Sequence, residues 1–377
     1  MSIDRIIHLS KMTGAAGAEG HLLVLLPGLR ARGLDARLWI LVEPDNPLPE
    51  YVERAQTAGV PVERIVIHHH LDPGLWRRLA ARFRAVRADL VDTHLLHADL
   101  YGIPAARRAG VPYVVSSRHN DDRFRYAWPM RLLNRWLWRQ ADAGIAISEA
   151  IRQFSIKVEG APANRIHTIY YGLDPGSITA PCDARQTLRA ALNIPADARV
   201  AGSVCRLTGQ KGLRYAIRGF ACIADQVPDA HYVIAGDGPL RQDLESEVRA
   251  LGLATHVHFL GWRDDAHAIL AALDVLLAPS LWEGFGLVLL EAMTCAVPII
   301  GTRVSAIPEV VVDGETGWLI PPRDPTAVAA ALLDALTHPQ ARCERGANGR
   351  RRLEMQFTAE KMVESTLALY HRLEVGD

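Results

Sequence analysis

The chain has 377 residues, of which 49% are hydrophobic and 22% charged, so its composition is that of an ordinary soluble protein and its length predicts two domains. Its 42 basic and 42 acidic residues balance, which argues against a general nucleic-acid-binding protein. There is no 18-residue apolar run, no leader pattern at the start and no C-x-x-C pair among the five cysteines, so we expect a cytoplasmic protein without a membrane-spanning helix, a disulfide framework or a zinc ribbon.

Short apolar runs alternate with helical patterns along the first half of the chain. Strands are predicted at residues 5–10, 36–42, 64–68, 90–94, 113–117 and 143–148, with helices between them such as 19–32 and 76–87. Fully apolar strands that alternate with helices are typical of a parallel sheet covered by helices on both faces.

The second half repeats this alternation after a break at residues 172–186, where two prolines and two glycines predict a linker. Strands follow at 199–204, 231–237, 257–261, 275–280 and 297–302, and helices at 213–226, 240–252, 266–273 and 326–336. We therefore predict an α/β protein with two doubly wound Rossmann-like domains, residues 1–175 and 185–350, that face each other across a cleft.

Several phosphate and metal motifs are absent from the sequence. It contains no G-x-x-x-x-G-K-[ST] and no G-x-G-x-x-G, which excludes a P-loop enzyme and disfavours a nicotinamide dehydrogenase. His68–His70 are consecutive, and consecutive side chains of an extended segment point to opposite faces. We therefore expect no metal site at these histidines.

The segment after the predicted strand at 275–280 carries the most informative pattern. A short loop, Glu283–Gly286, leads into a helix whose N-terminus would attract phosphate. Glu291 lies eight residues after Glu283, which separates the two carboxylates by roughly 12 Å along a helix. A glycosidase pair needs about 5–9.5 Å, so this spacing better suits a ligand with a sugar at one end and a ribose at the other. The alternative is a carboxylate at a helix N-terminus followed by a solvated glutamate.

Two cations lie in the loop after the predicted strand at 199–204. Arg206 and Lys211 could together neutralise a diphosphate, although exposed basic side chains are often only solvated.

Together these segments resemble glycosyltransferase family 4, the retaining enzymes of the GT-B fold that use nucleotide sugars, over nearly the whole chain. EGFGLVLLE at 283–291 is the most specific signal, because it resembles the donor-binding glutamate pair of the family. RLTGQKG at 206–212 is similar to its diphosphate loop, and the segment from Gly17 resembles its N-terminal glycine-rich loop. Further similar segments are 93–102, 116–121, 141–152 and 307–324.

The resemblance implies roles for the residues that match. Arg206 and Lys211 would hold the leaving diphosphate, Glu283 would bind the sugar hydroxyls, and His94 would lie near the transferred sugar; these four are the predicted catalytic residues. A lone histidine after a strand is otherwise often a core residue. The predicted donor-binding residues are Gly17, Glu19, Trp262, Arg263, Gly284, Phe285, Gly286, Leu287, Val288 and Glu291, and weaker acceptor-side candidates are His97 and His119.

We therefore expect a retaining hexosyltransferase that moves a sugar from a UDP- or GDP-sugar to a glycan or lipid-linked acceptor, in cell-surface polysaccharide or glycolipid biosynthesis. No metal or other cofactor is expected, because Arg206, Lys211 and a helix N-terminus would stabilise the leaving diphosphate and the sequence has no D-x-D triplet. The resemblance also places a C-terminal helix, 358–377, on the first domain. The alternatives are a nucleotide-sugar epimerase or hydrolase of the same fold and a non-catalytic sugar-nucleotide binder.

Charge is unevenly distributed along the chain. Residues 1–180 carry 23 Lys+Arg and 18 Asp+Glu, a net charge of +5, and residues 181–377 carry a net charge of −5. Basic, aromatic-rich helices at 124–140 and 76–87 predict peripheral contact of the first domain with a membrane surface. The alternative is that both helices simply cover the sheet, with arginine stems lying over apolar surface.

Overall fold

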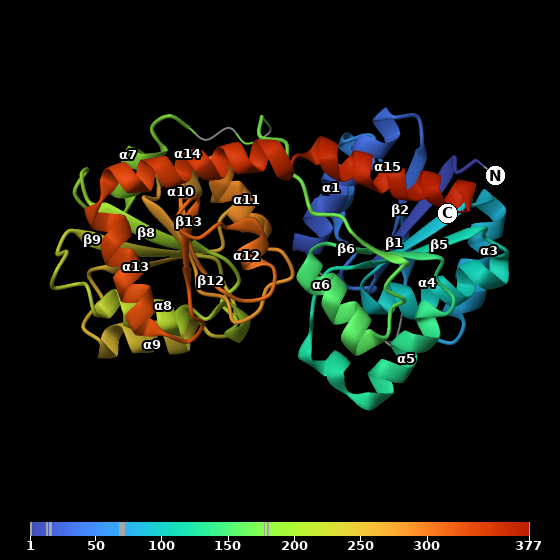
Figure 1. Cartoon of the computed structure of the whole chain (residues 1–377), viewed down its shortest axis with the longest axis horizontal. Coiled ribbons are helices and arrows are strands. Elements are labelled where there is room, and N and C mark those ends of the chain that lie inside the picture. The colour runs from blue at the N-terminus through green and yellow to red at the C-terminus, as the bar shows by residue number, and fades with distance from the viewer. Residues whose placement is uncertain are drawn as a thin grey trace. The chain divides into compact units, whose positions relative to one another are not determined.

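The computed structural model of the chain describes residues 2–12, 14, 17–67, 72–176, 178 and 181–376, so the histidine run 68–70 lies outside the described residues. The chain divides into an N-terminal unit, Met1–Gly172 with Ala359–Asp377, and a C-terminal unit, Leu173–Thr358 (Figure 1). The backbone N–H of Leu173 donates to the carbonyl of Phe357 at 2.9 Å. The segment expected to be a linker, 172–186, therefore begins at the last residue of Met1–Gly172, and the rest of it belongs to the C-terminal unit, where its end forms the start of α7.

The N-terminal unit is built on a seven-stranded parallel sheet of order β3-β2-β1-β4-β5-β6-β7. Its strands are β1 Arg5–Lys11, β2 Asp35–Val42, β3 Val62–Val66, β4 Leu90–His94, β5 Tyr113–Arg118, β6 Ala143–Ala146 and β7 Ile166–Thr168. Its helices are α1 Gly17–Ala31, α2 Pro49–Thr57, α3 Leu75–Val86, α4 Leu95–Ala109, α5 Trp128–Trp138, α6 Glu149–Phe154 and α15 Ala359–Val375, with a 3-10 turn η1 Arg123–Tyr126 and a π-turn η2 Ser155–Glu159.

Helices cover both faces of this sheet, as its apolar strands require. Strand β6 is buried along its whole length and its sequence, AGIA, is an apolar run that does not alternate. Strand β4 is also buried throughout, although Asp92, Thr93 and His94 are polar. Helix α15 packs on α1 over one face, and α3, α4 and α5 cover the other (Figure 1). The C-terminal helix thus belongs to the N-terminal unit.

The C-terminal unit has a six-stranded parallel sheet of order β10-β9-β8-β11-β12-β13. Its strands are β8 Arg199–Val204, β9 Ala230–Ala235, β10 Val257–Gly261, β11 Val275–Ala278, β12 Ile299–Thr302 and β13 Gly317–Ile320. Its helices are α7 Ala184–Ala191, α8 Leu213–Ala221, α9 Arg241–Ala250, α10 Ala266–Ala272, α11 Leu287–Thr294, α12 Ile307–Val310, α13 Pro325–Thr337 and α14 Pro339–Gln356, with a 3-10 turn η3 Gly209–Lys211.

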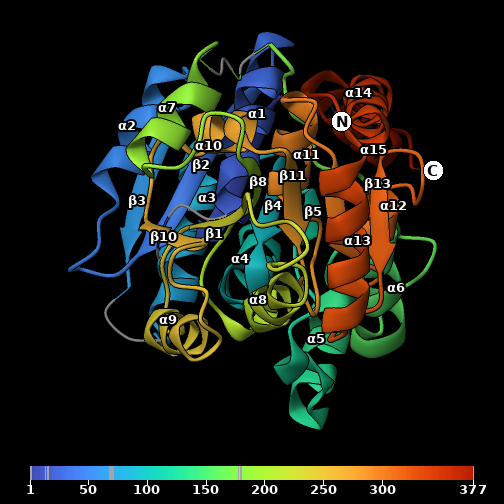
Figure 2. The ribbon, with the colours of Figure 1, turned by 90° about the vertical axis from the view of Figure 1, so that its left-hand side faces the viewer.

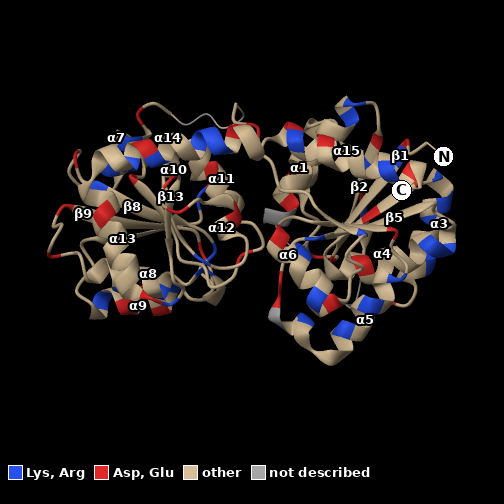
Figure 3. Cartoon of the chain, in the orientation of Figure 1, with Lys and Arg blue, Asp and Glu red and all other residues tan. Residues whose placement is uncertain are grey.

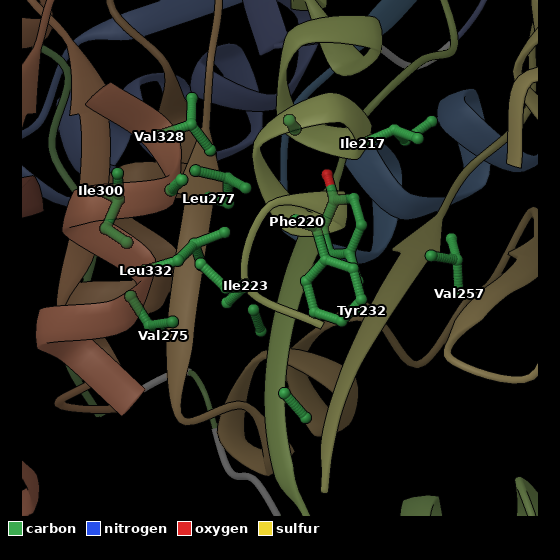
Figure 4. Packing of buried hydrophobic residues seen from close by; sticks show 14 of the residues in the cluster. Ile217, Phe220, Ile223, Tyr232, Val257, Val275, Leu277, Ile300, Val328 and Leu332 are labelled. Carbon is green, nitrogen blue, oxygen red and sulfur yellow. The ribbon is translucent and has the colours of Figure 1, made fainter. Parts of the chain in front are cut away.

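The core of this unit lies between the sheet and helices α8 and α13. Phe220 of α8 stacks on Tyr232 of β9 with ring centroids 5.8 Å apart, and Val328 and Leu332 of α13 pack beside them (Figure 4). Helices α8, α9 and α13 cover one face, and α7, α10, α11 and α14 cover the other (Figure 2). Buried Asp274 joins β11 to α7 and α14 through its ion pairs with Arg189 and Arg342, at 3.0 and 3.1 Å.

Strand order reverses between β1 and β4 in the first sheet and between β8 and β11 in the second. In doubly wound sheets, ligands bind outside the carboxyl ends of the strands at such a reversal. The two places to examine are therefore the loops after β1 and β4 and the loops after β8 and β11.

Candidate active site

The loops after β8 and β11 are bonded to each other at the reversal of strand order. The backbone N–H of Leu281 donates to the carbonyl of Gln210 at 2.7 Å, and the Gln210 side chain donates to the Trp282 carbonyl at 3.0 Å. Gly212 has a φ of +62°, and a Cβ there would lie 2.1 Å from the Pro279 oxygen. Only glycine allows this approach.

This arrangement brings two predicted catalytic residues into contact. The Lys211 ammonium lies 2.5 Å from the Glu283 carboxylate, and the Ser280 hydroxyl donates to the same oxygen at 3.2 Å. The Lys211 and Glu283 side chains are 15% and 14% exposed. Both line a pocket together with Ser280, Gly286 and Val288. The pair is therefore accessible to a ligand but shielded enough for its charges to matter.

The loop after β8 carries a further cation, and the helix after β11 presents N–H donors at its start. Arg206 is exposed, and its guanidinium group has no hydrogen-bond or ion-pair partner among the described residues. Gly286 precedes α11 with a φ of +84°. The first-turn amides of Leu287 and Val288 have no hydrogen-bond partner within the described part of the chain, as is usual at a helix N-terminus. This end of the C-terminal sheet is equipped to bind an anion.

The side chain of Phe285 points away from such an anion. It is 1% exposed and packs edge-to-face on Phe357, with ring centroids 5.8 Å apart. Gly284 is buried as well. Any contact of residues 284–288 with a ligand's phosphates would therefore run through their backbone.

Glu291 lies in α11, about one helical turn after Leu287. Its environment differs from that of Glu283, which lies in the loop before this helix. Its carboxylate has no hydrogen-bond or ion-pair partner among the described residues. Burial without a cation raises the pKa of Glu291 to about 7, because desolvation disfavours the charged form. A ligand that donates hydrogen bonds would relieve this cost.

A third loop, after β9, was not anticipated from the sequence. Gly236 and Gly238 have φ values of +129° and +158°, and a Cβ at Gly236 would lie 1.9 Å from the Cys205 oxygen. The Leu207 N–H donates to the Asp237 carbonyl at 2.9 Å. The loop therefore supports the segment that carries Arg206, and its signal was the G-D-G triplet.

Trp262 and Arg263 follow β10, the edge strand, which β9 separates from β8. Trp262 is 66% exposed, and Arg263 forms an ion pair with Asp265 at 2.6 Å. The described contacts do not bring either residue to the Lys211–Glu283 pair.

In the N-terminal unit, His94 ends β4 and is buried. Its Nδ1 lies 3.0 Å from Nε2 of His119, and its Nε2 lies 3.0 Å from Nδ1 of His8. The ring of His21 is within 5.5 Å of His94, centroid to centroid. The structure thus joins His94 and His119 and adds His8 and His21, which sequence reasoning missed because it did not establish that β1 and β4 are neighbours in this sheet.

The remaining candidates of the N-terminal unit lie on α1 and α4. Gly17 and Glu19 are in the first turn of α1, where the Glu19 carbonyl accepts from the Tyr51 hydroxyl at 2.9 Å. His97 is partly buried in the first turn of α4. Nowhere in the described ranges is a helix long and apolar enough to span a membrane.

Both halves of the chain match known families. The model described as Glycosyltransferase Family 4 matches residues 15–177, and that described as Glycosyl transferases group 1 matches residues 184–352. Together the two matches cover most of the chain and define a glycosyltransferase of the GT-B class.

Individual proteins of known description are also similar to this chain. It is 30% identical over 260 residues to the GDP-mannose-dependent alpha-(1-6)-phosphatidylinositol monomannoside mannosyltransferase of Mycolicibacterium smegmatis, covering 66% of this chain and 67% of that protein. It is 38% identical over 161 residues to the N-acetyl-alpha-D-glucosaminyl L-malate synthase of Bacillus anthracis, covering 43% and 42%. The chain belongs to the group 1 glycosyltransferases and is a hexosyltransferase.

A solved structure confirms the predicted fold class. The crystal structure of Anabaena HepE in complex with UDP and glucose superimposes with a TM-score of 0.86 at 23% sequence identity, covering 98% of this chain and 99% of that one. The chain therefore has the two Rossmann-like domains of a GT-B enzyme.

Proposed function

We propose that this glycosyltransferase moves a sugar from a UDP- or GDP-sugar to a glycan or lipid-linked acceptor with retention of the anomeric configuration. The Lys211–Glu283 contact carries the proposal, because it puts a cation and a carboxylate into one pocket at the reversal of strand order. The similar proteins are compatible with either nucleotide in the donor: one is GDP-mannose-dependent, and HepE was crystallised with UDP and glucose.

In this proposal the diphosphate lies at the loop after β8 and at the N-terminus of α11. Breaking the sugar–phosphate bond builds negative charge on the leaving diphosphate. Arg206, Lys211 and the amides of Leu287 and Val288 would stabilise that charge from fixed positions.

The two glutamates would bind the two ends of the donor. Glu283 would accept hydrogen bonds from the sugar hydroxyls while Lys211 turns to the diphosphate. Glu291, with a pKa of about 7 and no cation partner among the described residues, would accept the ribose hydroxyls. These roles follow from the family resemblance, and the role of His94 near the transferred sugar is a prediction from the same source.

We further propose that transfer needs no divalent metal. Two cations and a helix N-terminus supply the stabilisation that a metal would give, and Glu283, the carboxylate in this pocket, is already paired with Lys211. As the family resemblance implies, the leaving diphosphate would accept the proton of the acceptor hydroxyl, so that no separate protein base is required.

We propose that the acceptor is lipid-linked, or a glycan at a membrane, and that the protein works at the inner face of the membrane in polysaccharide or glycolipid synthesis. The surface of α5 and η1 supports this proposal. Five of its apolar side chains are between 44% and 72% exposed: Phe124, Tyr126, Trp128, Leu132 and Trp136. Arg131 and Arg135 of this helix, and Arg139 directly after it, are exposed. Figure 3 shows basic positions along α5 in blue.

A polar hollow adjoins this surface. Arg135, Arg139 and Arg165 line it without any acidic residue among its lining. None of the three guanidinium groups has a hydrogen-bond or ion-pair partner within the described residues. Exposed aromatic rings beside unpaired arginines suit an anionic membrane surface.

The second basic helix, α3, supports the alternative. Arg78 pairs with Asp72 and Arg82 with Glu63, each at 2.7 Å. Arg84 donates to the Arg108 carbonyl at 2.6 Å. Because these arginines have partners within the N-terminal unit, we expect α3 to cover the sheet and not to bind lipid.

The test is a panel of UDP- and GDP-sugars, each incubated with and without lipid-linked and free sugar acceptors, with the product's anomeric configuration read by NMR. We expect acceptor-dependent release of one nucleoside diphosphate and an α-linked product from an α-linked donor. Release of free sugar or an epimer without any acceptor would favour an epimerase or hydrolase, and inversion would exclude retention. Binding without turnover of any donor would favour a non-catalytic binder.

A further inference from the structure

The polar hollow beside α5 holds three arginines whose charges are not balanced. Arg135 lies in the last turn of α5, Arg139 directly follows this helix, and Arg165 directly precedes β7. None of the described residues that line the hollow is acidic. Like charges four positions apart on a helix repel each other, and the third arginine adds to this repulsion. The hollow is therefore electrostatically unfavourable until an anion enters it.

The carboxylates that lie near these arginines in the chain are committed elsewhere. Asp142 forms an ion pair with Arg107 at 2.6 Å. Glu159 is buried and forms ion pairs with Arg118 and Arg125. Since none of the three guanidinium groups of the hollow has a partner within the described part of the chain, the counter-charge is left to a ligand or to solvent ions.

Defined contacts hold two of the three arginines at the hollow. Gly160 ends η2 with a φ of +77°, and a Cβ there would lie 2.7 Å from Cγ of Arg135. The stem of Arg135 therefore lies directly over Gly160, where a larger residue would displace it. The backbone of Arg165 is fixed because its carbonyl accepts from the Gly144 N–H at 2.8 Å and its N–H donates to the Pro162 carbonyl at 3.0 Å.

The hollow lies at the opposite end of the N-terminal sheet from the acceptor-side candidates. Arg139 comes shortly before β6 and Arg165 directly before β7, so both lie at the amino ends of parallel strands. His94 ends β4 and His119 follows β5, at the carboxyl ends. A ligand in the hollow is therefore not bound where the acceptor is expected to react.

The chemistry of the hollow suits a phosphate group. Guanidinium groups bind phosphate oxygens through paired, charge-assisted hydrogen bonds. A phosphomonoester offers three acceptor oxygens and close to two negative charges near neutral pH, whereas a phosphodiester offers two free oxygens and one charge. Trp136, next to Arg135 in the chain, is 44% exposed, and an exposed aromatic ring beside arginines favours a lipid surface as the source of the phosphate.

We propose that Arg135, Arg139 and Arg165 form a binding site for the phosphate group of a membrane lipid, and that phosphomonoester headgroups bind there more tightly than phosphodiester headgroups. This site rests on the membrane contact proposed above and adds a headgroup preference to it. The lipid held here anchors the protein and is not the acceptor.

The experiment is co-sedimentation of the full chain with phosphatidylcholine vesicles that contain either phosphatidic acid, a phosphomonoester, or phosphatidylglycerol, a phosphodiester, at equal total charge. We expect the parent to bind the phosphatidic acid vesicles more tightly by about threefold or more. The double variant Arg135→Gln/Arg165→Gln should lose this preference. Because both side chains are exposed, the variant should keep the melting temperature of the parent.

The matched control is Arg77→Gln/Arg131→Gln, which removes the same two charges from exposed arginines that do not line the hollow. It should bind both kinds of vesicle more weakly and keep the preference for phosphatidic acid. Calorimetry with inorganic phosphate separates the two sources of phosphate. We expect no more than weak binding of inorganic phosphate, because it lacks the membrane contact of the neighbouring rings.

Three outcomes would overturn the proposal. If the parent showed no lipid preference and the two double variants weakened binding alike, diffuse charge would hold the membrane, and the membrane contact itself would stand. Tight binding of inorganic phosphate that only Arg135→Gln/Arg165→Gln abolishes, without a lipid preference, would assign the hollow to free phosphate. No binding of the parent to either vesicle would contradict the membrane contact and this site together, and would leave the glycosyltransferase activity unaffected.

Discussion

Glu291 shows how a single side chain links the fold to ligand chemistry. Burial raises the pKa of its carboxyl to about 7, so near neutral pH it exists as a mixture of acid and carboxylate. Ribose hydroxyls donate stronger hydrogen bonds to the carboxylate than to the neutral acid, which still accepts but more weakly. As the pH falls below 7, more of the free protein must lose a proton before it forms the stronger bonds, and affinity for the nucleotide decreases.

We therefore predict that the Kd for UDP or GDP rises about tenfold between pH 8 and pH 6 through Glu291. The β-phosphate also titrates near pH 6, so the informative quantity is the difference between the parent and Glu291→Gln. Calorimetry at pH 6, 7 and 8 should show that this part of the pH dependence is lost in the variant. Identical pH profiles for the two proteins would contradict the role of Glu291.

At the scale of elements, the donor site depends on how closely two loops approach. Gly212 lies where the loop after β8 meets the loop after β11, with a φ of +62° and no room for a Cβ against the Pro279 carbonyl. An alanine there must either adopt a left-handed conformation that costs about 1–3 kcal/mol or push the loops apart.

We predict that Gly212→Ala lowers the free energy of unfolding by about 2 kcal/mol or more. Gly209→Ala is the matched control in the same loop, because nothing lies within 4 Å of its Cβ position and its φ is not positive; it should change stability by less than about 0.5 kcal/mol. Urea unfolding of both variants measures the difference. Equal midpoints for the two would show that the loops do not need this contact.

Particular elements also show what the sequence could and could not predict. Buried strands such as β2 and β9 were predicted because their apolar runs are long enough to stand out. Strands β7 and β13, of three and four residues, were missed. β7, with the sequence IHT, is largely polar, and β13, GWLI, is bounded by Thr316 and Pro321, so neither stands out as an apolar run.

Local features of the candidate site could be predicted from the sequence, whereas contacts between residues far apart in the chain could not. Glu283 and Gly286 share one local motif, so their neighbourhood follows from the chain itself. The contact of Lys211 with Glu283 joins residues 72 positions apart, and only the order of the strands creates it. The gathering of His8 and His21 around His94 likewise depends on β1 and β4 being neighbours.

For the whole molecule, the distribution of exposed aromatic residues predicts where it meets a membrane. Trp128 and Trp136 on α5 are 72% and 44% exposed, and Trp262 of the C-terminal unit is 66% exposed. Only the first two lie among unpaired arginines. We predict that the protein co-sediments with anionic vesicles and less with neutral ones, and that salt weakens this binding.

The double variant Trp128→Ser/Trp136→Ser should reduce the bound fraction at least fivefold, because both anchoring rings are lost, whereas Trp262→Ser should bind like the parent. Vesicle co-sedimentation with phosphatidylglycerol-containing and pure phosphatidylcholine vesicles measures both effects. Equal binding to the two vesicle types, or no binding at all, would contradict the proposed contact with an anionic membrane.

In the proposed mechanism, protein cations, and not a metal, stabilise the leaving diphosphate. The most direct test is the rate of acceptor-dependent nucleoside diphosphate release by the parent, Arg206→Ala and Lys211→Ala, each with and without EDTA. We predict that each alanine variant loses about 10²–10³ in rate, or ~3–4 kcal/mol of transition-state stabilisation, and that EDTA does not slow the parent. Activity abolished by EDTA and restored by Mg²⁺ or Mn²⁺, or both alanine variants at near-parent rates, would contradict it.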